Sequence, residues 1–414
     1  MKIRSITYFD NLQWPLDQER IRQALDFIAI ARNTFQEGGF EVQTTRLATP
    51  PFPLILGDKM APEAINFAEA IEGQLISAGF DYASIGPAIP DYPLSYEILP
   101  EVLANTHSVF VAGIISSSET GIAPSAIKLC ASVIKRNAVI SADGFANLRF
   151  AALANVPPGA PFLPAAYHQV DDEPAFAIAT EAADLAVTAI KGAKNLEAAR
   201  AKLINSVETQ AAALTKLGDD LAASNGLQFA GIDFSFAPYP LAEQSIGTAI
   251  EQLGVPVLGH HGSLAAVAIL AEALDQARYP RVGFSGVMLP LLEDSVLAQR
   301  GIEEMLTLND LLLYSAVCGT GLDTIPLPGE VSEDKIFAIL LDLAALAQRL
   351  DKPLTARLMP IPGKRSGDTT DFDFEFFANS RVLNLKAQPL TGLLTGDEPY
   401  KLKSKVIVER DRDR

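Results

Sequence analysis

The chain has 414 residues, of which 49% are hydrophobic and 20% charged, and its formal net charge at pH 7 is −17. So acidic a protein lacks the basic face that nucleic-acid backbones and anionic membranes attract, and we expect neither as a partner. Two cysteines cannot form a disulfide framework, and the N-terminus lacks a signal-peptide pattern, so the sequence predicts a cytoplasmic protein with free thiols.

The first part of the chain alternates between two hydrophobic periods. Apolar residues at alternating positions or in short runs predict strands at residues 3–8, 40–47, 82–85, 109–115, 139–143 and 148–156. Apolar residues at helical spacing predict helices at residues 17–35, 62–79, 96–104 and 124–135.

The second part begins with a long alanine-rich stretch, residues 173–221, which predicts helices interrupted near Gly192. Further strands are predicted at residues 229–236, 282–289, 354–359 and 381–385. Further helices are predicted at residues 241–253, 263–277 with Ser263 as N-cap, 291–304, and 332–350 with Ser332 as N-cap. The stretch Ser315–Gly329 is expected to open as an apolar strand and then turn polar.

Strands alternating with helices indicate an α/β fold with a mainly parallel sheet. We expect one domain over residues 1–390, with residues 173–221 as a helical elaboration, followed by a charged tail at 391–414. The tail is either a solvated extension or a contact for a partner. Periodicity alone does not separate a closed barrel from an open, doubly wound sheet.

The most unusual stretch is Ser315–Gly329, which holds three glycines and two prolines. Such backbone chemistry suits a shaped loop better than a core strand. The loop carries Cys318, a nucleophile if a neighbouring cation lowers its pKa, and Asp323, a candidate base. The alternative for Cys318 is a small core residue, as we expect for the other cysteine, Cys130.

Acidic residues follow two other predicted strands. Asp233 and Ser235 lie at the end of one, where α/β folds place their sites; the alternative for Asp233 is a cap of a turn. Glu293 and Asp294 follow the next strand and would bind a divalent metal or act as a base. Their alternative is a favourable interaction with the dipole of a helix N-terminus.

Two basic motifs complete the candidates. The segment ARLMPIPGKRSGD brings together Arg357, Lys364, Arg365 and Asp368, and predicts a cradle for a carboxylate or phosphate, or else a salt-bridged surface loop. His260, in the motif GHHGS before a helix, would transfer protons or bind a metal, unless it is a solvated or capping histidine.

The chain resembles one known family through the following blocks, in this order: MKIRSITYF, PPGAPFLPAAY, GIDFSFAP, SGVMLPLLED, SAVCGTGLDTIPLPG and ARLMPIPGKRSGD. The family is known as the seven-eleven domain of unknown function. The resemblance implies a ten-stranded α/β barrel similar to pyruvate formate-lyase and other glycyl-radical enzymes, with Cys318 on or near an inner loop. The radical-bearing glycine of those enzymes has no counterpart, because the nearest string, residues 381–385, reads RVLNL. Only the fold is therefore inherited.

Three hypotheses for function follow. The leading one is a non-radical enzyme that acts on a small anionic metabolite in a barrel pocket, with Arg357 and Lys364 holding the anion and Cys318 lining the reacting centre. One of three acids would serve as base or as ligand of a divalent metal, namely Asp233, Glu293 or Asp323. The second is a non-catalytic metabolite-binding or sensing protein on the same barrel. The third is a structural subunit of an assembly, and a homodimer fits any of the three.

Overall fold

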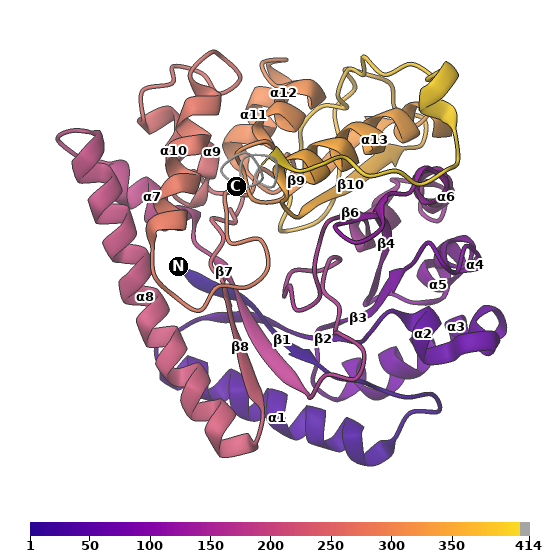
Figure 1. Ribbon diagram of the computed structural model, residues 1–414. Helices are drawn as coiled ribbons and strands as arrows, with labels where there is room; N and C mark the ends of the chain where they lie inside the picture. Colours follow the sequence, from indigo (N-terminus) through magenta and orange to yellow (C-terminus); the bar gives the residue numbers. More distant parts are fainter. Residues whose placement is uncertain (406–414) are drawn as a thin grey trace, which may run out of the picture.

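In the computed structural model, which describes residues 1–405, the strands lie at the centre and helices surround them (Figure 1). A ten-stranded mixed sheet has the order β8-β7-β1-β2-β3-β4-β6-β10-β9, and the short strand β5 pairs with β4. The strands are β1 (Lys2–Phe9), β2 (Val42–Ala48), β3 (Tyr82–Ala88), β4 (Val109–Ser117), β5 (Gly121–Ile122), β6 (Phe150–Ala154), β7 (Ala175–Glu181), β8 (Gln228–Asp233), β9 (Gly321–Pro328) and β10 (Leu354–Ile361).

Most helices connect consecutive strands and pack their apolar faces on the sheet. They are α1 (Gln18–Glu37), α2 (Phe52–Leu56), α3 (Met60–Gln74), α4 (Leu94–Glu97), α5 (Leu99–Asn105), α6 (Pro124–Ala138), α7 (Ala183–Ile190), α8 (Leu196–Asn225), α9 (Ile246–Gln252), α10 (Ser263–Gln276), α11 (Ser295–Ile302), α12 (Leu308–Tyr314) and α13 (Glu333–Leu350). Helix α1 shows the principle, because its buried residues, such as Ile21, Ala24 and Ile28, recur at helical spacing.

Apart from the short strand β5, the strands of the sheet fall into two groups that run in opposite directions. Strands β1, β2, β3, β4 and β6 pair in parallel, as do β7 with β8 and β9 with β10. The two groups meet in antiparallel fashion where β1 pairs with β7 and where β6 pairs with β10. The predicted α/β class with a mainly parallel sheet is thus confirmed.

The ladder of these strands is not closed, because β8 and β9 are its two ends. The ten named strands by themselves therefore do not form the closed barrel that the family resemblance implies. Residues 281–290, which we call the bridging segment, lie between the two ends. Three isolated parallel bridges join this segment to its neighbours: Ile232 to Arg281, Phe236 to Val287, and Pro290 to Asp323.

Several predicted elements are confirmed, but some of the predicted strands are not formed. Residues 139–143 form the turn after α6, since Val139 is 76% exposed and has no strand beside it. Residues 381–385 form no strand and contribute only an isolated bridge at Arg381. The bridging segment replaces the strand predicted at 282–289, because positive φ angles at Gly283 and Ser285 interrupt an extended backbone.

Four further predictions concern where helices and strands begin. The stretch predicted as helical from residue 173 starts with β7, which lies between β1 and β8. Its alanine-rich sequence, AFAIATE, is compatible with a helix and with a strand. Pairing with β1 on one side and β8 on the other makes it a strand. Ser315 does not open a strand but follows the end of α12. Ser332 caps α13 as predicted, whereas the N-cap of α10 is Gly262 and not Ser263.

The C-terminal stretch from residue 391 to 405 lies against the fold. Tyr400 forms an isolated bridge with Ile122 of β5, and Lys128 of α6 pairs with Asp397 at 2.6 Å. Residues 406–414 of the predicted tail lie outside the described residues. Among the helices of residues 1–405, none has the length and apolar character needed to cross a membrane.

Two glycines of conspicuous motifs meet where the bridging segment passes the start of β9. The amide of Gly319 donates to the carbonyl of Val287 at 2.8 Å. A Cβ atom at Gly319 would lie 2.8 Å from the Cα of Gly286, and one at Gly286 would lie 2.5 Å from the Cα of Gly319. The glycine beside Cys318 is therefore required by close approach of two backbones.

We expect Gly319→Ala to destabilise the protein by about 1–3 kcal/mol, because the added methyl group overpacks a contact between two backbones. Urea denaturation followed by circular dichroism measures the change. Gly73→Ala is the matched control, since no atom lies within 4 Å of its added Cβ and the site is in helix α3. Equal stability of the two variants would contradict this account of the contact.

Candidate functional site

A cavity of about 350 Å³ lies against the sheet, lined by residues of β1, β2, β3, β4, β9 and β10 and of the loops beside them. Its lining is of two kinds. The charged side chains are Arg4, Arg46, Arg149, Glu293, Asp323 and Arg357, with His107 also present. The aromatic side chains are Tyr82, Phe110, Phe145, Phe162, Phe284, Phe374 and Phe376.

Five charged side chains in and beside the cavity form a continuous series of ion pairs, which we call the ion-pair chain: Glu181, Arg4, Glu293, Arg357 and Asp323. Arg4 bonds to Glu181 at 2.9 Å and to Glu293 at 3.0 Å. Glu293 also accepts from Arg357 at 2.7 Å, and Arg357 bonds in turn to Asp323 through its Nε. The chain joins β1, β7, β9 and β10, so it links both groups of strands across the cavity.

β-Bulges place three members of the ion-pair chain. The register of β1 against β7 shifts between Ile3 and Ser5, which puts Arg4 at the irregularity. The register of β10 against β9 shifts around Arg357 and Asp323, where Thr324 has a φ of 46°. A bulge changes the direction in which a side chain projects, and bulges are common beside active sites.

The pKa values within the ion-pair chain follow from burial and from the partners. Burial alone would lower the pKa of Arg357, but the carboxylates of Asp323 and Glu293 raise it above its ordinary value. Burial raises the pKa of Glu181, which Arg4 and the amide of Gln43 partly oppose. Arg357 therefore remains charged, and each carboxylate of the chain has an arginine partner.

Arg46, on β2, is the exception. Its Nε donates to Thr44 Oγ1 at 3.0 Å, and within residues 1–405 the rest of the guanidinium has neither hydrogen bond nor ion pair. Arg46 is only 8% exposed. Burial, with the nearby charges of Arg4 and Arg357, lowers its pKa to about 9. At neutral pH this is a buried, charged group without a carboxylate partner.

Aromatic rings line the rest of the cavity. The rings of Tyr82 and Phe110, on neighbouring strands, meet edge to face with centroids 5.3 Å apart. Phe374 meets Phe145 edge to face at 5.2 Å. The guanidinium carbon of Arg4 lies over the ring of Phe376, 4.9 Å from the ring centroid. The segment that carries Phe374 and Phe376 follows β10 and faces the charged residues.

Of the residues predicted from sequence, three come together at the cavity: Asp323, Glu293 and Arg357. The other members of the basic cluster do not join them. Lys364 pairs with Asp371 at 3.3 Å, and Arg365 is exposed. Asp368 accepts from the backbone amide of Arg365 at 2.7 Å, so it stabilises a turn. The structure thus divides the predicted cradle, of which only Arg357 lines the cavity.

Asp233 and Ser235 bind the bridging segment. Asp233 is fully buried and accepts hydrogen bonds from the amides of Phe284 at 2.7 Å and Ser285 at 2.8 Å. Its third donor is the hydroxyl of Ser235 at 2.6 Å, and that hydroxyl accepts from the amide of Gly286. Neither residue lines the cavity. This geometry joins the end of β8 to the bridging segment.

Glu293 and Asp294 point to different places. Asp294 is the N-cap of α11 and accepts from the amides of Val296 and Leu297. It also accepts from Ser245 and from the start of α9, and burial raises its pKa. The two acids therefore do not share an ion, and no group of three potential metal-binding side chains gathers anywhere in residues 1–405.

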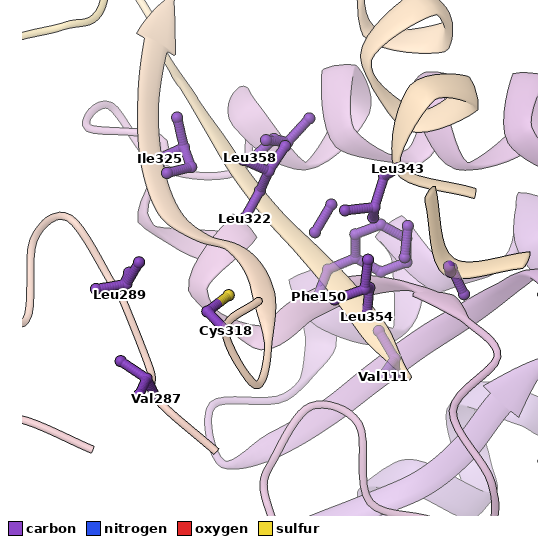
Figure 2. Close-up of a cluster of buried hydrophobic side chains, with 14 of the residues drawn as sticks. Val111, Phe150, Val287, Leu289, Cys318, Leu322, Ile325, Leu343, Leu354 and Leu358 are labelled. Atoms are coloured by element: carbon purple, nitrogen blue, oxygen red, sulfur yellow. The ribbon is translucent and has the colours of Figure 1, made fainter. Parts of the chain in front are cut away.

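Cys318 lies in the hydrophobic core. Figure 2 shows its side chain among Val287, Leu289 and Leu322, and the residue is 2% exposed. It does not line the cavity. The carbonyl of Cys318 accepts from the ammonium group of Lys352, while the thiol faces apolar neighbours. A role for this thiol in a reacting centre stays a prediction.

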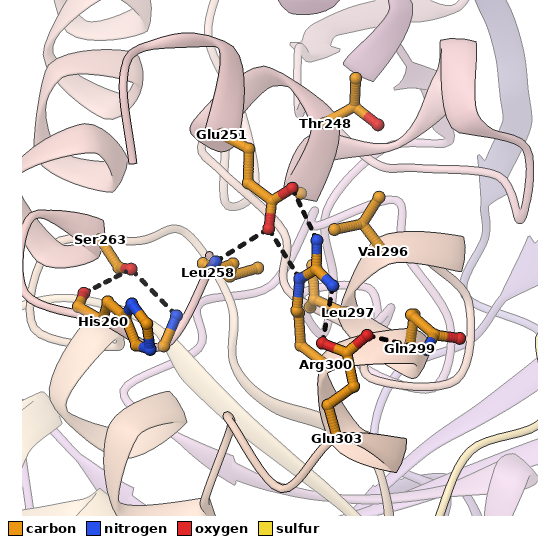
Figure 3. A network of polar contacts seen from close by, with 12 residues as sticks. Thr248, Glu251, Leu258, His260, Ser263, Val296, Leu297, Gln299, Arg300 and Glu303 are labelled. Carbon is orange, nitrogen blue, oxygen red and sulfur yellow. Dashed lines mark hydrogen bonds and ion pairs between the residues drawn. The ribbon is translucent and has the colours of Figure 1, made fainter. Parts of the chain in front are cut away.

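His260 is exposed and lies away from the cavity. Its carbonyl accepts from the hydroxyl of Ser263 at 2.8 Å, which is the contact drawn in Figure 3. The same view shows Glu251 accepting from Arg300 at 2.7 and 2.9 Å. That ion pair ties α9 to α11 near the GHHGS turn.

Sequence reasoning did not identify Arg4, Arg46 or Glu181. Each is a charged residue within a strand whose other residues are largely apolar or small, as in KIRSITYF, VQTTRLA and AFAIATE. A charge in an inner strand requires a buried partner or a ligand. The sequence therefore carries a signal for these three residues, and it lies in the strands and not in the glycine-rich motifs.

Comparisons with known proteins give one consistent result. A family model described as "Uncharacterised ACR (DUF711)" matches residues 1–379. A UPF0210 protein of Pyrobaculum aerophilum is 34% identical over 350 residues, covering 80% of this chain and 76% of the relative. UPF0210 proteins of Acetivibrio thermocellus and Clostridium perfringens are 29% and 26% identical, each covering 85% of this chain and 81% of the relative.

The pKa of Asp233, which burial raises to about 6, predicts a pH dependence of stability. Between its unfolded pKa of about 3.9 and about 6, the folded state binds more protons at this site than the unfolded state. Its contribution to stability is therefore full below pH ~4 and is lost as the pH rises through about 6. Relative to Asp233→Asn, the wild type should lose roughly 3 kcal/mol over this interval.

Urea denaturation of both proteins at several pH values from 4 to 7 measures this difference. The other buried acids are present in both proteins and cancel. A gap between the two proteins that stays constant with pH, or widens in favour of the wild type, would show that the bonds from Ser235 and the two amides outweigh burial.

Proposed function

We propose that this chain, which belongs to the uncharacterised family DUF711, is a non-radical enzyme that acts on a small anionic metabolite in the cavity. The observation that carries the proposal is Arg46, a buried arginine that lines the cavity and has no carboxylate partner within the described residues. A buried charge without compensation is costly, and an anionic ligand would supply the compensation.

The chemistry available to such an enzyme follows from the contacts. The terminal nitrogens of Arg46 have no partner within residues 1–405 and can bind a carboxylate in the bidentate manner. Asp323 accepts from Arg357 through one oxygen only and lines the cavity, so it is the candidate base. Glu293 is held between two arginines and would position Arg4 and Arg357.

We further propose that the sheet is the ten-membered barrel implied by the family resemblance. The bridging segment would stand in for a strand between β8 and β9, which its three isolated parallel bridges support. Together with β7, β8, β9 and β10 it would make a group of five, opposite the five parallel strands β1, β2, β3, β4 and β6. The cavity would then be the interior of that barrel.

The second candidate function is metabolite binding without catalysis. It is favoured by one observation, that the carboxylates lining the cavity are both engaged by arginine. A paired carboxylate is a weak base, and no thiol lines the cavity among the described residues. In this case Arg46 would still hold the ligand, and the ion-pair chain would serve only to shape the site.

Arg46→Met should abolish anion binding and leave stability equal or higher. Methionine fills a similar volume without a charge, and replacing buried charges by apolar groups has raised stability by about 1–4 kcal/mol. Native mass spectrometry of protein purified without chelators detects a bound anion, and thermal denaturation measures stability.

The matched control is Arg365→Met, which removes an exposed arginine of the cluster that lies outside the cavity. This variant should bind like the wild type. Loss of binding in the control, or full binding by Arg46→Met, would refute the assignment of the anion site to Arg46.

Asp323→Asn separates the two candidate functions. Purified wild-type protein is incubated with a defined mixture of small carboxylic acids, and consumption and retention are followed by mass spectrometry. An enzyme should consume a compound that Asp323→Asn retains but turns over at least about 100-fold more slowly, the usual scale for loss of a general base. Retention without consumption by the wild type would favour the binding protein.

A further inference from the structure

We infer that the ligand of the cavity carries a single carboxylate on an aromatic body, an inference that rests on the proposed function. Among residues 1–405, the cavity offers one free cation beside a set of aromatic rings, and these two features specify the two ends of the ligand.

The single charge follows from which arginines of the cavity are free. Arg4 and Arg357 are occupied by carboxylates of the ion-pair chain. Arg149 donates to the backbone carbonyls of Leu103 at 2.8 Å, Thr106 at 2.8 Å and Val109 at 3.2 Å. Arg46 is therefore the one arginine lining the cavity, within the part of the chain described, whose terminal nitrogens have no partner.

A second anionic group on the ligand would have no second free guanidinium to bind among residues 1–405. Glu293 and Asp323, which line the same cavity, already occupy Arg4 and Arg357, and each carboxylate is 8% exposed or less. A dicarboxylate or a phosphate would leave part of its negative charge without a pairing donor in a buried site, which is costly. The structure therefore favours a monoanion with a planar, bidentate head.

The aromatic body follows from the position of the rings relative to Arg46. Arg46 and Tyr82 are directly paired in the β2–β3 register, and Tyr82 meets the ring of Phe110 on the next strand. A ligand with its carboxylate on Arg46 therefore extends along Tyr82 toward Phe110. Phe145 and Phe374 form a second ring pair in the same lining.

Aromatic pairs add about 0.5–1.5 kcal/mol beyond the area they bury, and 1.4 kcal/mol is about tenfold in affinity. A cavity of about 350 Å³ is also within the range of about 300–1,000 Å³ that small-molecule sites span. An aromatic monocarboxylate thus uses both the charge and the rings, whereas a short aliphatic acid uses the charge alone.

Four matched probes test the inference by isothermal titration calorimetry on the full chain. Phenylacetate has both features, acetate lacks the ring, phenylmalonate adds a second carboxylate, and 2-phenylethanol lacks the charge. We expect phenylacetate to bind at least tenfold more tightly than each of the others. In Arg46→Met, phenylacetate should fall to the affinity of 2-phenylethanol, with circular dichroism verifying the fold.

A second variant, Phe110→Leu, keeps the site apolar and removes one ring, so it should weaken phenylacetate but not acetate. Acetate or phenylmalonate binding as tightly as phenylacetate, in a manner that requires Arg46, would overturn the aromatic body or the single charge and leave the proposed anion site intact. If no anion binds in a manner that requires Arg46, the proposed function itself is wrong.

Discussion

The interior of this protein is organised by the requirement that a buried charge be compensated. Glu181, Arg4, Glu293, Arg357 and Asp323 satisfy it among themselves, in one series of ion pairs that crosses from β7 through β1 to β10 and β9. Removing any member would leave a partner charged and buried, which costs more than the pair contributes. The chain therefore makes the two groups of strands depend on each other, in addition to the backbone ladders at β1–β7 and β6–β10.

An element of this fold could be predicted from sequence where its local hydrophobic pattern and its tertiary contacts favour the same structure. Strands such as β1 and β4, and helices such as α1 and α13, agree with their patterns because apolar faces and caps point to the same element. Strand β7 was not predicted because its alanines suit a helix equally well. Its neighbours β1 and β8, distant in sequence, decide the matter. Closure of the sheet is likewise a property of pairing between distant segments and leaves no local signature.

The polar and glycine-rich motifs at strand ends make contacts that connect backbone segments. Asp233 and Ser235 bind the amides of the bridging segment, Asp294 caps two helices, and Gly319 admits the backbone of Gly286. These contacts hold the bridging segment against its neighbours in place of a regular ladder of backbone hydrogen bonds. Such a ladder cannot form there because the segment has φ angles that a strand does not tolerate. Glu293, Asp323 and Arg357 are predicted from an acidic pair, a glycine-rich loop and a basic cluster, and all three line the cavity. Each is a charge within or just after a strand, where exposure to solvent is small.

The same reasoning singles out Arg46. Every other arginine that lines the cavity has a structural explanation, in carboxylates for Arg4 and Arg357 and in backbone carbonyls for Arg149. For Arg46 the described residues supply only the hydroxyl of Thr44, and burial lowers its pKa without any partner to oppose the effect fully. A buried charge with so few partners is expected to cost the fold some stability. Such a cost is expected where a residue serves binding and not folding. A charge in an inner strand is accordingly the stronger indicator of the site in this chain, and a glycine-rich loop the weaker one.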